Sequence, residues 1–254
     1  MTPFIMNPFR FGAGAGEAGS WKEVARTTLG SANHVISVTG IPDKLYYMIL
    51  QDQQNISSTQ NIQATINNDT GSNYADRYAV NGGSDATQSS QTSLRPNGNA
   101  SQQTGQDTFS VGHFSNLSSS EKLDMFGSNI MNGTGAGNAP NRCEAVNKWA
   151  NTSSVINRYD LLAGTGSSTF GTGSEVVVLG YDPTDTHTTA DNFWQELYSG
   201  SGTSIDTGVA GITAKKYLFI QIYLNGLTSA TTMKAVLNGD IGSNYALRRS
   251  QDGA

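Results

Sequence analysis

Residues 61–80, NIQATINNDTGSNYADRYAV, read as two β-strands joined by a tight turn. The flanking runs are short and carry β-branched or aromatic residues, which is typical of strands. The central NNDTGSN is rich in residues that accept positive φ angles or bond to nearby backbone amides. We therefore expect a compact loop, after which Tyr74 begins the next strand.

The same phrase returns as NGDIGSNYALRRSQDGA at residues 238–254. When residue n is aligned with residue n + 171, sixteen positions between residues 40 and 83 are identical without a gap, far more than a chance alignment gives. With a small change of spacing upstream, Trp21 and Glu23 align with Trp194 and Glu196. The sequence therefore predicts a duplicated module.

This repeat divides the chain into four predicted parts. Residues 1–20 form an N-terminal arm with a Gly-rich linker, residues 21–182 a complete module, residues 183–193 a linker, and residues 194–254 a partial second module. The second copy lacks counterparts of residues 84–182, so it would expose strand edges and half a core.

Three explanations of the half-module stay open. The natural chain continues beyond Ala254, the half-module is completed by another subunit, or it packs on the first module as extra strands. We favour the first, because SQDGA, the last five residues, offers no element that would lock the end of a domain.

Short β-type runs without intervening helical periods fill the rest of residues 21–182, which predicts an all-β, antiparallel β-sandwich. One stretch is more helical, because Ser118 to Glu121 resembles a capping box, although Gly127 cuts it short. Residues 81–107 are expected to be a polar loop that is either functional or flexible. The clearest strands are KEVARTTL, HVISVTGI, KLYYMILQ, TFSVGHF, RCEAVNKWA and SEVVVLGY, and KKYLFIQIYL is expected as a strand of the second copy.

Composition argues against several classes of function. Charged residues are 14% of the chain, the net charge is −5 and no basic run occurs, so we expect no nucleic-acid partner. No membrane span or secretion signal is recognisable, and we expect no membrane association.

No catalytic, metal or cofactor motif is convincing. The single cysteine, Cys143, lies in a predicted strand and is expected to be a buried structural thiol. Asp182, Asp185 and Asp191 do not have calcium-loop spacing. GAGEAG at residues 14–19 matches the glycine spacing of a dinucleotide-binding motif, but it lacks the preceding strand and the following helix that such a site needs. We therefore expect no enzymatic activity, no metal and no cofactor.

The N-terminal arm has the composition of a docking segment. MTPFIMNPFRF is aromatic and interrupted by proline, and GAGAGEAGS after it is a flexible linker. Buried aromatic rings and a paired arginine commonly anchor protein interfaces. The candidate docking residues are Phe4, Pro8, Phe9, Arg10 and Phe11.

The repeated loop is the other candidate site. Asn67, Asp69, Asn73 and Tyr74 could form a sugar or calcium site. The competing interpretation is that Asp69 and Asn73 satisfy the backbone of the loop itself, and we favour it, because every copy of a module must keep its structural corners.

With these phrases in view, the chain resembles a module of tailed-bacteriophage virion structural proteins. The resemblance covers residues 21–182 and the partial second copy, and it implies a β-sandwich of jelly-roll type. The phrases that carry it are KKYLFIQIYL, NNDTGSNYADR, KWANTSSVINRYDLL and GSEVVVLGYD.

The resemblance implies a structural virion protein that serves as a capsid decoration or head fibre. The alternative is a tail fibre or adhesin that binds host-surface carbohydrate. The resemblance also implies that the partners are other capsid or tail proteins and that the chain forms a homo-oligomer such as a trimer. It implies synthesis in the host cytoplasm and a final location on the virion surface. Trp21, Trp194 and Tyr74 are the aromatic residues that could stack on a sugar.

Overall fold

The structure is a computed structural model that describes residues 17–18, 20–187, 191–198, 209–222 and 234–249. Its regular elements in these residues are thirteen β-strands, β1 to β13. All pairings between the strands are antiparallel. The all-β class expected from the sequence is therefore confirmed.

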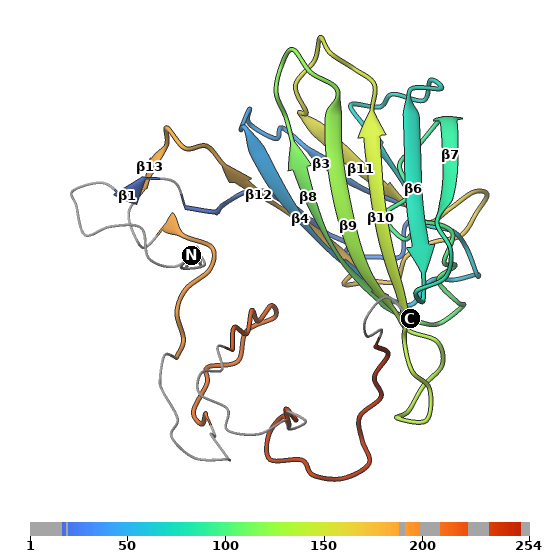
Figure 1. The fold of residues 1–254 in the computed structure, drawn as a ribbon, viewed down its shortest axis with the longest axis vertical. Coiled ribbons are helices and arrows are strands. Elements are labelled where there is room, and N and C mark those ends of the chain that lie inside the picture. The colour runs from blue at the N-terminus through green and yellow to red at the C-terminus, as the bar shows by residue number, and fades with distance from the viewer. Residues whose placement is uncertain (1–16, 19, 188–190, 199–208, 223–233, 250–254) are drawn as a thin grey trace.

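Eight strands form the larger sheet, in the order β2-β12-β4-β8-β9-β10-β6-β7. Figure 1 shows it as a twisted fan with β8, β9 and β10 in front. Its strands are β2 (Lys22–Thr28), β4 (Tyr46–Gln53), β6 (Tyr74–Val80), β7 (Ala86–Gln91), β8 (Thr108–Ser115), β9 (Lys122–Ile130), β10 (Asn141–Trp149) and β12 (Glu175–Tyr181).

Three strands form the smaller sheet, in the order β3-β11-β5. They are β3 (Val35–Thr39), β5 (Gln63–Ile66) and β11 (Arg158–Leu162), and β3 and β11 lie behind the larger sheet in Figure 1. A separate short pair joins β1 (Glu17–Ala18) to β13 (Thr186–His187), within the predicted N-terminal arm and the predicted linker.

The two sheets pack as a β-sandwich around one apolar core, as the sequence predicted. Strand side chains alternate between the core and the outside, and β9 shows this most regularly, with every second residue buried. Cys143 lies fully buried in β10, which confirms that its thiol is buried, as expected. The core combines Ile36, Val38, Tyr159 and Leu161 of the smaller sheet with Ile49, Phe126, Trp149, Val176 and Val178 of the larger.

The segment after β7 completes the smaller layer, because three strands cannot cover eight. Leu94 forms a β-bridge with Ala64 of β5, and Gln102 forms one with Gln60. Residues 93–102 therefore extend the smaller sheet with backbone that is largely buried. The prediction of a polar loop over residues 81–107 was therefore wrong in part, because the stretch contains strand β7 and this inner layer of the sandwich.

Polar side chains of the larger sheet satisfy that buried backbone. Ser128 Oγ donates to the carbonyl of Pro96 at 3.0 Å, and the Arg95 amide donates to Asn147 Oδ1 at 3.2 Å. Ser110 Oγ also donates to Asn97 Oδ1 at 3.1 Å. Buried polar groups need such partners, so the serines and amides inside the sandwich follow from the loop that lies on them.

Two further local expectations were wrong. The stretch near Ser118–Glu121 does not start a helix but leads into β9, because pairing with β8 and β10 outweighs the local capping signal. In addition, described residues 213–222 contain no strand. In the first module, the strand that aligns with this run is β4, which pairs with β12 and β8. Residues 194–254 hold no counterpart of β12 or β8, so the run lacks the strands that β4 pairs with.

Asp124 of β9 is a buried carboxylate with a strongly raised pKa. Asn147 Nδ2 donates to one of its oxygens at 2.6 Å, and the other oxygen has no hydrogen-bond partner. Burial raises the pKa of Asp124 to about 7, and the nearby Asp76 adds to the rise. Asp76 is itself buried, with Arg95 Nε 3.9 Å from its carboxylate.

Because the folded protein holds a proton on Asp124 that the unfolded chain releases near pH 4, stability falls as the pH rises from about 4 to 7. We predict that Asp124→Asn removes much of this slope and makes the protein more stable than wild type at pH 8, by roughly 1–3 kcal/mol. Denaturant unfolding at pH 5, 6, 7 and 8 measures the effect. Glu144→Gln, an exposed change on β10, should keep the wild-type slope, and an unchanged slope in Asp124→Asn would contradict the prediction.

Candidate functional site

The predicted loop residues lie together at one corner, between β5 and β6. Asn67 and Asn68 have φ angles of 54° and 56°, in the left-handed region. Asp69 Oδ1 accepts from the Gly71 amide at 2.9 Å, and Asn73 Nδ2 donates to Asp69 Oδ2 at 2.9 Å. The Tyr74 hydroxyl donates to the carbonyl of Asp69 at 2.9 Å. These contacts close the loop on itself.

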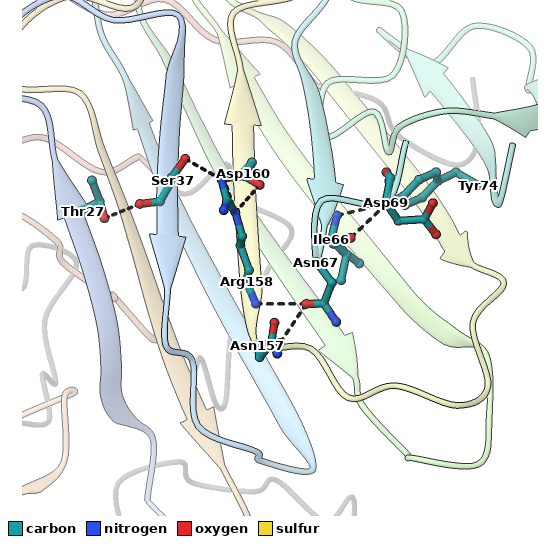
Figure 2. Close-up of polar contacts among 9 residues, drawn as sticks. All are labelled: Thr27, Ser37, Ile66, Asn67, Asp69, Tyr74, Asn157, Arg158 and Asp160. Carbon is teal, nitrogen blue, oxygen red and sulfur yellow. Dashed lines mark hydrogen bonds and ion pairs between the residues drawn. The ribbon is translucent and has the colours of Figure 1, made fainter. Parts of the chain in front are cut away.

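Two further contacts tie the corner to both layers. The Trp149 indole of β10, in the larger sheet, donates to Asp69 Oδ2 at 2.6 Å. Figure 2 shows the contact to the smaller sheet, where Asn67 Oδ1 accepts from the amides of Asn157 and Arg158 at 3.0 and 3.1 Å. Asn67 Nδ2 donates to the carbonyl of Val155 at 2.8 Å. The corner therefore fixes the two sheets relative to each other.

The electrostatics of Asp69 agree with this role. Partial burial opposes its ionisation, but hydrogen bonds from Trp149, Asn73 and Gly71 outweigh the burial and lower its pKa. The carboxylate is thus charged and engaged by protein donors. The contacts of Asn67, Asp69, Asn73 and Tyr74 fit the structural interpretation, which the sequence favoured over a sugar or calcium site.

The second phrase forms the same turn without the same surroundings. Asp240 accepts from the Gly242 amide and from Asn244 Nδ2, both at 2.9 Å, and the Tyr245 hydroxyl donates to the carbonyl of Asp240 at 3.0 Å. Asn238 has a φ of 53°. Tyr245 is 42% exposed, whereas its counterpart Tyr74 is 2% exposed. The turn is therefore encoded locally, and its burial depends on the rest of the module.

A second candidate region is the outer face of the larger sheet, which the sequence analysis did not assign. A row of side chains crosses five neighbouring strands on this face, from β12 to β10, through direct cross-strand pairs. Outer faces of sheets are normally polar when they meet water. This row is mostly apolar and consists of Leu179, Met48, His113, Met125 and Val146.

Residues from the C-terminal part cover one side of this face. Phe193, Trp194 and Tyr217 pack on a cluster centred on Leu50 and Val177. Between the two parts runs a groove of about 660 Å³, along which the repeat-related Trp21 and Trp194 both lie. Its other lining residues include Met48, Phe109, Val111, Tyr217, Phe219, Asp52 and Lys216.

Glu175 of β12 holds this covering segment in place. Its Oε1 accepts from the Tyr217 hydroxyl at 2.8 Å and lies 3.2 Å from Lys216 Nζ, while Oε2 accepts from Thr28 and lies 2.9 Å from an Arg26 nitrogen. Burial opposes ionisation, but these partners outweigh it and lower the pKa of Glu175 to about 2. Lys216 also lies 3.1 Å from Asp52.

Sequence reasoning missed this face, although one signal was present. Apolar residues occupy both faces of KLYYMILQ and of KKYLFIQIYL, a pattern typical of a strand covered on both sides. No sequence pattern indicated that Glu175 would meet Lys216 and Tyr217, because these residues are far apart in the chain.

The other predicted residues lie elsewhere. Phe4, Pro8, Phe9, Arg10 and Phe11 are outside the described residues, so their docking role stays a prediction. Burial raises the pKa of the Cys143 thiol to about 12, which makes a thiolate nucleophile unfavourable. Among the described residues, no three His, Cys, Asp or Glu side chains gather as a metal site. No helix within the described ranges has the length and hydropathy to cross a membrane.

No protein-family model, curated protein or solved structure matches the chain.

The two copies of the turn provide a matched test of the corner. We predict that Asp69→Ala destabilises the protein by about 2–4 kcal/mol, because it leaves the buried Trp149 indole without its acceptor and removes the bonds to Gly71 and Asn73. Asp240→Ala breaks the same local bonds at an exposed turn and should change stability by less than about 0.5 kcal/mol. Denaturant unfolding followed by Trp fluorescence measures both, and equal effects would contradict the interpretation.

Proposed function

We propose that the chain is a structural protein of a tailed-phage virion, displayed on the particle as a capsid decoration or head fibre. One observation carries the proposal: the same corner phrase occurs twice and forms the same hydrogen bonds in a buried and in an exposed setting. A unit that is used repeatedly along a fibre-like chain must specify its corners locally. The resemblance of the surrounding phrases to virion modules gives the class of particle.

The all-β architecture supports the same proposal. Antiparallel sheets held by long-range strand pairing and a cross-layer corner give a rigid module that can project from a surface. The polar residues singled out in the sequence, Asn67, Asp69, Asn73 and Tyr74, are engaged in holding strands together. Polar side chains that hydrogen-bond between strands are what we expect in a structural module.

In this proposal the N-terminal arm attaches the protein to the particle. Phe4, Phe9 and Phe11 would be buried in a groove of a capsid or tail protein, and Arg10 would pair with a carboxylate or with carbonyl groups. The Gly-rich residues 12–16, which precede β1, would let the modules swivel.

We predict that deletion of residues 1–12 abolishes incorporation into the particle without unfolding the sandwich. Particles assembled with tagged full-length or truncated chain are purified, and the bound tag is quantified. Thermal unfolding of the truncated chain should match that of the full-length protein. Asp240→Ala serves as a control that should assemble normally, and normal incorporation of the truncated chain would refute the docking role.

The outer-face groove supports a second candidate, an adhesin that binds host-surface carbohydrate. Trp21, Trp194 and Tyr217 present aromatic surface beside the charged groups of Asp52 and Lys216. Aromatic faces with adjacent polar groups suit the stacking and hydrogen bonding of a sugar ring. This location differs from the loop at Tyr74, whose side chain is buried.

If the groove binds a sugar, a broad glycan array probed with the full chain should give hits that Trp21→Ala and Trp194→Ala each weaken by at least tenfold. Leu237→Ala, at the second turn, is the matched control and should bind as wild type. Circular dichroism checks that each variant is folded. Absence of any binding by the folded wild type would eliminate this second candidate.

A further inference from the structure

The outer face of the larger sheet continues beyond the groove as an exposed apolar strip. The row that starts at Leu179 and Met48 runs on to Met125 and Val146, which are 56% and 46% exposed. The neighbouring row adds Leu123 and Tyr46, at 56% and 41% exposed. Apolar strips of this kind are uncommon on monomers and usually mark an interaction surface.

The covered side of the same face indicates what kind of surface fits it. Tyr217, Phe219 and Trp194 lie along the groove, with the ring of Tyr217 stacked on Phe109 at 5.8 Å between centroids. In the repeat alignment these three residues correspond to Tyr46, Met48 and Trp21. All three counterparts border the groove or its face in the first module.

Within one chain, therefore, residues that align with the outer face of the first module lie against that same face. The face is covered by the repeat equivalents of its own side chains. The strip from Met125 to Val146 is the uncovered continuation of that same face, on the adjacent strands β9 and β10.

We propose that this strip binds a second copy of the chain, with the same strip of the two copies meeting face to face around a two-fold axis. Such a contact must be compatible with itself, so its rim needs both signs of charge. The rim around β9, β10 and β6 has them in largely exposed pairs: Lys148 with Glu121 at 2.8 Å, Arg142 with Glu144 at 3.7 Å, and Arg77 with Asp85 at 3.4 Å.

The size of the strip sets the strength of the contact. Strands lie about 4.8 Å apart and rise about 3.4 Å per residue, so the two strands β9 and β10 over six residues give roughly 200 Å² of flat area. A standard stable interface buries about 800 Å² on each partner. The pair is therefore weak and depends on concentration.

This inference does not depend on the proposed virion role, and it specifies a two-fold pair where the resemblance implied a trimer.

Sedimentation velocity of the full chain between 1 and 200 µM, roughly the range of weak contacts, tests the proposal. Wild type should shift from monomer toward dimer as the concentration rises. Met125→Lys combined with Val146→Lys places two charges in the strip and should weaken the dimer at least tenfold. Ile241→Lys is the matched control, because Ile241 is 91% exposed and lies in the second turn, and it should dimerise as wild type.

Cross-linking gives an independent readout that does not rely on disruptive changes. Met125→Cys should form a disulfide-linked dimer under mild oxidation, since the two-fold arrangement brings this position close to its mate, and Cys143 is buried. Ile241→Cys, although more exposed, should cross-link more slowly. Thermal unfolding checks that all variants are folded.

Three results would overturn the proposal. A wild type that stays monomeric at the highest concentration would assign the strip to a different protein or to the C-terminal segment of the same chain. A dimer that resists the double lysine change would place the contact on another surface. A trimer would exclude the two-fold arrangement.

Discussion

The corner at Asn67 and Asp69, where the chain passes from β5 to β6, holds the sandwich together because its single loop bonds to both sheets. Asp69 receives the indole hydrogen of Trp149 from the larger sheet, and Asn67 receives two amides from the start of β11 in the smaller sheet. One loop thus bonds to both layers at once. A slip of one residue in either sheet would turn every side chain to the opposite face, so a contact that fixes both registers protects the whole core.

The imbalance between eight and three strands explains the unusual polarity of the interior. An apolar inner face on all eight strands would need apolar cover that three strands cannot provide. Instead, residues 93–102 lie over part of the larger sheet, and Ser110, Ser128 and Asn147 bond to this buried segment. The arrangement leaves Asp76 and Asp124 incompletely satisfied, which is why burial raises the pKa of each.

The sequence predicted what is local and missed what is long-range. The turn at Asn67 to Tyr74 follows from residues with strong conformational preferences, and the strand runs follow from β-branched and aromatic composition. The buried path of residues 93–102 could not be predicted, because Ser, Asn and Gln have the same composition in a solvated loop and in a satisfied interior. The capping signal at Ser118 failed for a similar reason, since local preference is weaker than pairing with β8 and β10.

The second copy separates these two contributions within one molecule. Its turn, from Leu237 to Tyr245, keeps the bonds of the first turn although no layer covers it. Its KKYLFIQIYL run has the composition of β4 but no strand in residues 213–222, because a strand needs neighbours to bond with. What that run retains is its outer-face chemistry, and it uses Tyr217 and Phe219 on the outer face of the first module. Residues 213–222 form no strand, yet Tyr217 and Phe219 still lie on the outer face to which their aligned residues Tyr46 and Met48 belong.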